Sequence, residues 1–373
     1  MKILYVNNNK VAGDCGGSIG SQKFFCFLKR CKEENKIEDF LIFSPDNFPS
    51  KYNFAISKKR SLDFLSRLIG KSNFLYFYMI KYKKYILDYA ADTVIIQNSR
   101  LGFFAKFYKH FFPKSQIICN FDNIEYDYSM MAIRKPFNIL ERIIVKKCEK
   151  ESIVFSDKLC FLTERDFFRA KNIYGRFQNL SIICPVSLPF PSSPLIIHSV
   201  KPTIVFLGKL DYLPNKEAVS FLICNILPKI KRDHLDVIVA GANPDNKLKH
   251  LCSQYHVRLI GNFSSTSVFI PIGSALISPL LSGFGMKTKI AEALSLGMFV
   301  IGSKESLVGY SKAENPNCVC CHTLSDYILA INYYTAHFTG QLYNSNIEIY
   351  KQFYSMDSFY FNFWDFLTKN EKD

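Results

Sequence analysis

The sequence predicts an α/β protein of two domains, each built around a parallel sheet. Three observations carry this prediction. Short apolar runs alternate with longer helical stretches in two series along the 373 residues. Glycine-rich turns follow the first strand of the chain and a strand that ends near residue 279, and such turns are typical of the carboxyl edge of a parallel sheet. Between the two series, five prolines in 185–202 predict an extended interdomain linker.

Composition limits the classes of function. Lys and Arg number 47 against 32 acidic residues, and the net charge of +15 favours an anionic partner. Phosphorylated substrates and an anionic membrane surface fit this charge. Nucleic acid is not expected, because zinc-finger spacing, an Arg-rich tail and RNA-binding motifs are absent from the sequence. Twelve cysteines without a regular framework, and no apolar leader or long apolar run, predict a cytoplasmic protein, soluble or peripheral on a membrane.

The first series predicts strands at 3–6, 39–43, 93–97, 116–121 and 180–185, and before the last of these 157–166 is a strand that runs into a helix. After the first strand, Gly16 and Gly17 lie in a glycine-rich loop that leads into a helix beginning near Ser18. This loop does not match the dinucleotide pattern, which argues against NAD, and an ordinary strand-to-helix turn stays open. Helices are expected at 98–112 and 136–155. Thr163 is the expected N-cap of the helix after the fifth strand.

The segment 71–91 is rich in both aromatic residues and lysines. A helix of this composition could lie on an anionic membrane with its rings at the headgroups. The alternative is a helix that packs on the sheet and leaves its lysines in water, because the aromatic residues fall on several faces. The sequence leaves both open.

The second series predicts strands at 203–208, 236–240, 257–260, 274–279, 298–302 and 317–323, with a helix at 216–227. Within it, Gly283 and Gly285 permit a sharp turn before a helix that starts between 286 and 289. Free backbone N–H groups at this helix start, together with Lys287 and Lys289, predict a phosphate site. Glu292, one turn further, is placed to accept a hydrogen bond from a sugar hydroxyl.

The segment 283–303, GFGMKTKIAEALSLGMFVIGS, resembles the donor site of family 4-like (group 1) glycosyltransferases with the GT-B fold. GKLDYLPN at 208–215, NFDNIEY at 120–126 and LTERD at 162–166 resemble further corners of that family. The resemblance implies two Rossmann-like domains that face a central cleft, with a C-terminal helix that crosses back to the first domain. The implied division is 1–185 on the acceptor side, a linker at 186–202, a nucleotide-sugar domain at 203–344, and a helical tail at 345–373 that packs on the first domain.

The resemblance also implies roles for individual residues. Lys209, Lys287 and Asp122 are the expected catalytic residues, with Asp122 in the position where the family has a histidine. The expected substrate-binding residues are Gly16, Gly17, Asn123, Glu125, Gly285, Lys289 and Glu292. Glu125 and Asp127 are equally interpretable as caps of a helix.

The resulting prediction is a hexosyltransferase that moves a sugar from a nucleotide-diphosphate donor to a hydroxyl of a surface polysaccharide or glycolipid, with retention of configuration. No metal or cofactor is expected, and the Cys-rich segment 318–322 lacks zinc-site spacing. Three alternatives remain: a GT-B nucleotide-sugar-binding scaffold with little or no activity, a sugar-nucleotide epimerase, and a phosphorylase, which is usually longer.

Overall fold

The computed structural model describes residues 1–10, 16–45, 54–132, 137–189, 191, 194–263 and 265–369. The chain divides into two compact units. The first unit contains Met1–Pro185 and Tyr360–Asp373, and the second unit contains Val186–Phe359.

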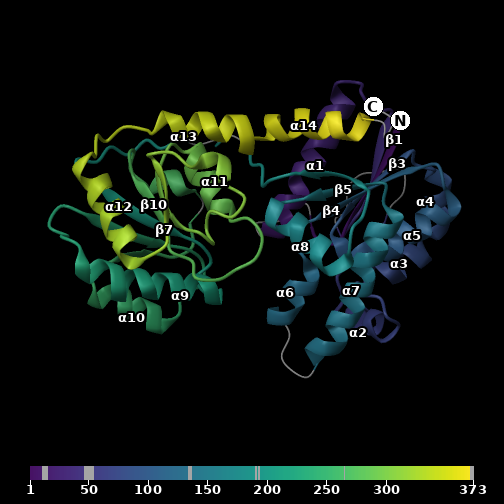
Figure 1. Ribbon diagram of the computed structural model, residues 1–373, viewed down its shortest axis with the longest axis horizontal. Helices are drawn as coiled ribbons and strands as arrows, with labels where there is room; N and C mark the ends of the chain where they lie inside the picture. The colour runs from purple at the N-terminus through teal and green to yellow at the C-terminus, as the bar shows by residue number, and fades with distance from the viewer. Residues whose placement is uncertain are drawn as a thin grey trace. The chain divides into compact units, whose positions relative to one another are not determined.

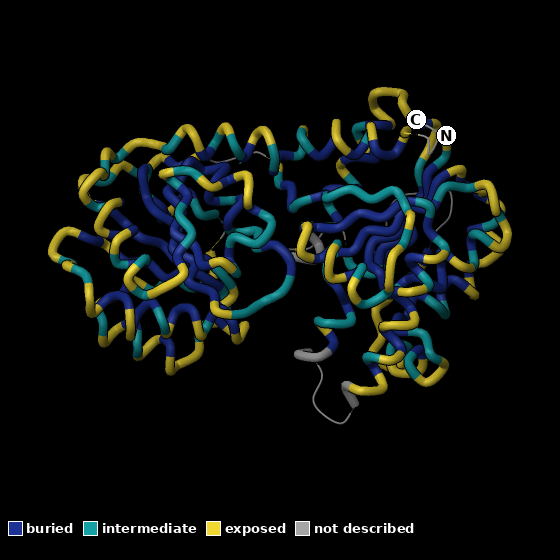
Figure 2. Tube along the Cα trace, viewed as in Figure 1, coloured by how far each residue is buried: buried dark blue, intermediate teal, exposed yellow. Residues whose placement is uncertain are grey.

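The first unit has a six-stranded parallel sheet in the order β2-β1-β3-β4-β5-β6 (Figure 1). Its strands are β1 (Lys2–Asn7), β2 (Asp39–Phe43), β3 (Thr93–Gln97), β4 (Gln116–Phe121), β5 (Lys158–Phe161) and β6 (Leu180–Ile183). The central strands are almost fully buried (Figure 2). Since helices cover both faces of a parallel sheet, strands with few polar residues are what such a sheet requires.

The helices of the first unit are α1 (Gly16–Glu33), α2 (Arg60–Leu68), α3 (Leu75–Lys81), α4 (Lys83–Tyr89), α5 (Gly102–Phe111), α6 (Glu125–Ala132), α7 (Phe137–Phe155) and α8 (Glu164–Tyr174). A short 3₁₀ turn, Ser99–Leu101, precedes α5. At Gly102, an added Cβ would lie 2.2 Å from the carbonyl oxygen of Cys148, so only glycine lets α5 pack this closely on α7. The predicted N-cap is confirmed, since Thr163 Oγ1 accepts from the N–H of Asp166 at 3.0 Å.

The segment 71–91 forms two short helices, α3 and α4, whose aromatic residues pack into the core. Phe74, Tyr78, Tyr82 and Tyr89 are buried in the cluster that covers one face of the sheet. The Tyr82 hydroxyl accepts a hydrogen bond from the N–H of Ala55 at 3.0 Å. The alternative of a packed helix therefore holds, and these rings are not available to a membrane.

The last helix, α14 (Met356–Thr368), packs its C-terminal part in the first unit. The ring of Phe363 lies 5.2 Å from Phe24 and 4.9 Å from Phe27 of α1. At the helix end, the buried ammonium of Lys158 donates to the carbonyls of Phe366, Leu367 and Lys369. A lysine from β5 thereby satisfies carbonyls that the end of a helix leaves without a partner.

The second unit has a parallel sheet in the order β12-β11-β10-β7-β8-β9. Its strands are β7 (Thr203–Leu207), β8 (Asp236–Ala240), β9 (Arg258–Ile260), β10 (Ala275–Ser278), β11 (Phe299–Ser303) and β12 (Cys318–Cys321). Its helices are α9 (Leu213–Phe221), α10 (Asn246–Gln254), α11 (Thr288–Ser295), α12 (Leu324–Ala336) and α13 (Asn344–Ile349). Residues of α9, α10 and α12 share one core cluster with β7, β8, β10 and β11.

Several elements differ from the sequence prediction. The helix expected at 216–227 begins earlier, with α9, and continues as a π-helical turn over Leu222–Ile226. Two segments expected outside the second domain lie in the second unit. The proline-rich segment 186–202 pairs with it through a bridge between Leu188 and Ser355, and the first part of the tail, 345–359, also belongs to it. Of the helices described, none is long and apolar enough to cross a membrane.

Candidate functional site

The turn after β7 brings together two of the predicted site residues. Gly208 has φ of 154°, and an added Cβ there would lie 2.7 Å from the Asn215 amide. Asn215, at the start of α9, donates to the carbonyl of Lys209 at 2.8 Å and accepts from Lys289 Nζ at 3.1 Å. One amide thus links the backbone of Lys209 to the side chain of Lys289. The side chain of Lys209 is exposed.

The loop after β10 has the predicted glycine turns. Gly283 has φ of 148° and Gly285 of 59°, and α11 begins at Thr288, within the predicted range. Lys287 Nζ donates to the carbonyls of Phe284 and Gly285 at 3.2 and 2.9 Å. It also lies 3.0 Å from Glu305 Oε1. Lys287 therefore holds the loop in shape, with Glu305 balancing its charge.

Lys289 and Glu292 follow on α11 and are half-buried. The ammonium of Lys289 lies 4.3 Å from the centre of the Phe206 ring. Burial lowers the pKa of Lys289 to about 7, and the charge of Lys287 adds to this effect. Burial raises the pKa of Glu292, whose carboxylate accepts from Thr266 Oγ1 at 3.3 Å. A diphosphate beside Lys289 would favour its charged form, so this side chain is suited to bind an anion with uptake of a proton.

The first unit has a polar cluster at the carboxyl edge of its sheet. Asp122 directly follows β4, and its Oδ1 accepts from Gln97 Nε2 at 2.5 Å and from Asn120 Nδ2 at 2.9 Å. Gly20 of α1 is close, since an added Cβ would lie 3.5 Å from Asp122 Oδ1. Burial raises the pKa of Asp122 to about 7, although the charge of Lys23 on α1 opposes the shift. This carboxyl group can therefore hold or release a proton near neutral pH.

Glu125 lies in a separate network of charges. It is buried, and its carboxylate accepts from Arg100 Nε at 2.7 Å and from Asn98 Nδ2 at 3.3 Å. Glu125 and Asp127 both lie in the first turn of α6. The buried carboxylate of Glu149 on α7 accepts from the N–H groups of Glu125 and Tyr126 at 3.0 and 2.9 Å. Asp127 pairs with Arg169 of α8 at 2.7 Å. These contacts are of the kind that stabilises the fold.

Comparison with known proteins finds a family match within the second unit. Residues 201–323 match the family of Glycosyl transferases group 1. No curated protein matches the sequence. Three solved structures similar to the whole chain are sucrose-phosphate synthase from Thermosynechococcus elongatus, the lipopolysaccharide outer core galactosyltransferase WaaB in its apo form, and HepE from Anabaena in complex with UDP.

Their TM-scores are 0.70, 0.66 and 0.63, at identities of 11%, 13% and 11%. Each alignment covers 98% to 99% of this chain and 98% to 100% of the other chain. At such identities the likeness establishes the fold, which is GT-B. The chain therefore has the GT-B fold, and residues 201–323 of its second unit match the group 1 glycosyltransferase family. The resemblance in 283–303 and the expected GT-B fold are thereby confirmed, and the match supports the enzyme class expected from the sequence.

The predicted site residues lie in two groups, one in each unit. Lys209, Lys287, Lys289 and Glu292 lie on neighbouring turns at the carboxyl edge of the second sheet. Asp122 and Asn123 follow β4 of the first sheet, and Asn123 is half-exposed. Gly16 and Gly17 open α1, while the loop before them, 11–15, lies outside the described residues.

Four partners in these groups were missed by the sequence prediction. Gln97 and Asn120 are polar residues at the carboxyl end of otherwise apolar strands, and this signal was available in the sequence. Asn215 appeared there only as part of a motif. Lys23 carries no local signal, because a lysine in a helix is usually exposed. Its burial, with donation to the carbonyls of Cys184 and Pro185, depends on contacts distant in sequence.

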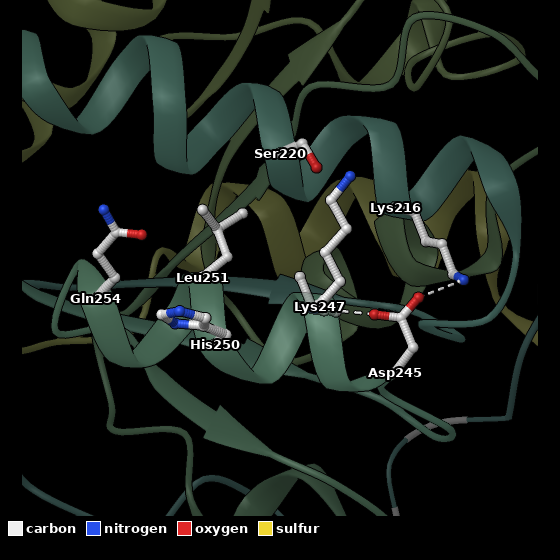
Figure 3. A pocket seen from close by; sticks show the side chains of 8 residues that line it. Lys216, Ser220, Asp245, Lys247, His250, Leu251 and Gln254 are labelled. Atoms are coloured by element: carbon white, nitrogen blue, oxygen red, sulfur yellow. Dashed lines mark hydrogen bonds and ion pairs between the residues drawn. The ribbon is translucent and has the colours of Figure 1, made fainter.

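A groove of about 330 Å³ lies apart from these residues, between α9 and α10 (Figure 3). Lys216 pairs with Asp245 at one end of the groove at 2.7 Å, and His250 and Gln254 lie toward the other end. None of the predicted site residues lines it. Over the described residues, no group of three or more His, Cys, Asp or Glu side chains is arranged to hold a metal ion.

Proposed function

We propose that this protein is a glycosyltransferase that moves a hexose-type sugar from a nucleotide-diphosphate donor to a hydroxyl of a surface polysaccharide or glycolipid, with retention of configuration. The observation that carries the proposal is the link through Asn215, which places the turn of Lys209 beside the ammonium of Lys289. A lysine on the turn after β7 and a second lysine in the first turn of α11, at one edge of the sheet, are suited to a diphosphate. The UDP in the similar HepE structure is consistent with such a donor.

Each residue of the second unit has a role in the proposal. Lys209 and Lys289 bind the diphosphate oxygens. Lys287 orders the loop of Phe284 and Gly285, so that backbone N–H groups at the start of α11 face the same oxygens. Glu292 accepts hydrogen bonds from the ribose hydroxyls, and Gly285 allows the donor to approach the backbone.

In the transfer, the bond between the anomeric carbon and the diphosphate oxygen breaks, and its electron pair stays on the diphosphate. The acceptor oxygen forms the new bond to the anomeric carbon, and its proton passes to an oxygen of the departing diphosphate. Fixed cations that favour charge on the leaving group lower the barrier of this step. Asp122, with Asn123 beside it, accepts a hydrogen bond from a hydroxyl of the sugar or of the acceptor.

Titration with a panel of nucleotide-sugars tests the proposal. At least one donor is expected to bind and to be slowly hydrolysed, with release of the nucleoside diphosphate. Lys209→Ala should strongly weaken binding of the nucleotide-sugar and of the nucleoside diphosphate, since a charge-assisted contact contributes about 1.5–3 kcal/mol. Binding of the nucleoside, which has no phosphate, should change little. Lys216→Ala is the matched control, because Lys216 pairs with the exposed Asp245 in the groove. If no nucleotide-sugar binds, or if both variants lose the same affinity, the proposed site is wrong.

A second candidate function is a nucleotide-sugar-binding scaffold without turnover. It is favoured by Asp122, because its carboxylate is already engaged by Gln97 and Asn120, whereas a histidine would be able to both donate and accept. Donor binding without release of free sugar or of product, over the whole panel of donors and saccharide acceptors, would support the scaffold against the enzyme.

A further inference from the structure

The helix α2 of the first unit has an inverted arrangement of polar and apolar residues. Its Ser66 is fully buried, and the carboxylate of Asp63 accepts from the N–H of Phe74 at 3.2 Å. Its large apolar residues, in contrast, face water. Phe64, Leu65, Leu68 and the adjoining Ile69 are 45% to 63% exposed. A helix that only covers a core would have the opposite arrangement.

The first turns of α7 show the same inversion. Glu141 is buried, whereas Ile139, Leu140 and Ile143 are 57% to 63% exposed. The two helices are joined, because Arg67 Nε of α2 lies 2.7 Å from Glu141 Oε2, and Figure 1 shows α2 beside this end of α7. The polar side chains that would normally face solvent thus make contacts between the two helices. Seven large apolar side chains are left on the outside of adjacent elements, where single exposed residues are the norm.

The exposed charge on these two helices is of one sign. The carboxylates on the two helices are Asp63, Glu141, Glu149 and Glu151, and none of them is exposed. The exposed charged residues on the same helices are all basic: Arg60 at the start of α2, and Lys146, Lys147 and Lys150 along α7. Lys58 and Lys59, just before α2, are also exposed. We call this surface of α2 and α7 the α2/α7 face.

We propose that the α2/α7 face binds an anionic lipid membrane. The apolar side chains of α2 and of the first turns of α7 enter the boundary between headgroups and acyl chains, and the exposed lysines and Arg60 contact anionic headgroups. Exposed apolar residues next to cations, without exposed carboxylates, match the chemistry of such a surface. A second copy of this chain fits less well, because its own cations would face those of the first copy.

Flotation of the protein with vesicles tests this proposal without any sugar substrate, so its failure leaves the proposed transfer untouched. Wild type is expected to bind vesicles of phosphatidylcholine with 30% phosphatidylglycerol and to bind pure phosphatidylcholine weakly. The triple change Phe64→Gln, Leu68→Gln and Ile143→Gln should weaken binding by more than about tenfold. Its control changes Phe168, Ile196 and Leu329 to Gln; these are also exposed apolar residues, and binding should change by less than about twofold.

A second pair of variants tests the charges. Changing Lys146, Lys147 and Lys150 to Glu should release the protein from the anionic vesicles. The control changes Lys81, Lys83 and Lys84 of α3 and α4 to Glu, which alters the net charge by the same amount. This control should retain most of the binding, since the aromatic residues of these helices are buried.

Three outcomes would overturn the proposal. Wild type could fail to bind anionic vesicles, or each control could lose as much binding as its α2/α7 variant. The third outcome concerns the variant with Phe64, Leu68 and Ile143 changed to Gln. If light scattering shows that its oligomeric state differs from that of wild type while its vesicle binding is unchanged, the α2/α7 face is an interface between copies of the chain. Circular dichroism of each variant shows whether it is folded, and the two independent triples keep the test decisive if one of them is not.

Discussion

Binding of a nucleotide-sugar should take up a proton through Lys289. In the free protein the pKa of this residue is about 7, because burial and Lys287 disfavour the ammonium. A lysine with this pKa is about three-quarters protonated at pH 6.5 and about 3% protonated at pH 8.5. If only the ammonium form binds the diphosphate, the dissociation constant of the donor rises about 25-fold between these pH values.

The 25-fold change is the upper limit, and a bound donor that raises the pKa of Lys289 to about 9 gives about a 19-fold change. Such a shift of about two pKa units corresponds to about 2.7 kcal/mol, at 1.36 kcal/mol for each unit. A hydrogen bond to a charged group contributes about 1.5–3 kcal/mol, so one contact between Lys289 and the diphosphate suffices. The sign follows directly: affinity is highest below pH 7 and decreases as the pH rises.

Isothermal titration calorimetry in buffers of different ionisation enthalpy measures both the dissociation constant and the number of protons taken up. Wild type should take up about 0.8 proton at pH 8. Lys289→Arg should bind with little dependence on pH, because the guanidinium stays charged throughout the range. The reasoning is refuted if the affinity of wild type changes by less than about twofold from pH 6.5 to 8.5. It is refuted equally if the arginine variant shows the same pH dependence as wild type.

Three further predictions follow from named contacts. Asp122→Asn should keep donor binding, reduce transfer, and raise the melting temperature more at pH 8 than at pH 5. The reason for the pH dependence is that the buried acid has a pKa of about 7, so its ionisation destabilises the fold as the pH rises. Unchanged turnover in this variant would show that Asp122 has only a structural role. Asn215→Ala should weaken binding of the nucleotide-sugar about tenfold and leave the circular dichroism spectrum unchanged, since the variant lacks the amide that bonds to the backbone of Lys209 and to the side chain of Lys289. An affinity equal to that of wild type would contradict this role. Lys158→Met should lower the free energy of unfolding, measured by urea titration, by about 2 kcal/mol, because the carbonyls at the end of α14 lose their hydrogen-bond donor. A loss below about 0.5 kcal/mol would show that water replaces the lysine as donor.

The sequence alone determined those features that depend on neighbours along the chain. Buried parallel strands are short apolar runs, so β3, β4 and β8 were predicted with their observed bounds. The Thr163 cap and the glycine turns of 283 and 285 are likewise set by a few adjacent residues. The motif in 283–303 placed Lys287, Lys289 and Glu292 on one turn and one helix because their spacing is local.

Only the tertiary structure decided which polar and aromatic groups are occupied by partners and which face water. Lys23 is buried against the carbonyl of Cys184, 161 residues away, and Glu125 is held by Arg100, 25 residues away. The aromatic segment 71–91, a candidate for a membrane contact in the sequence, is packed, whereas Phe64 and Ile143 are exposed. The burial of a side chain depends on elements that meet only after folding. A local pattern shows that a helix is amphipathic, and the packing of the whole unit determines which of its faces meets solvent.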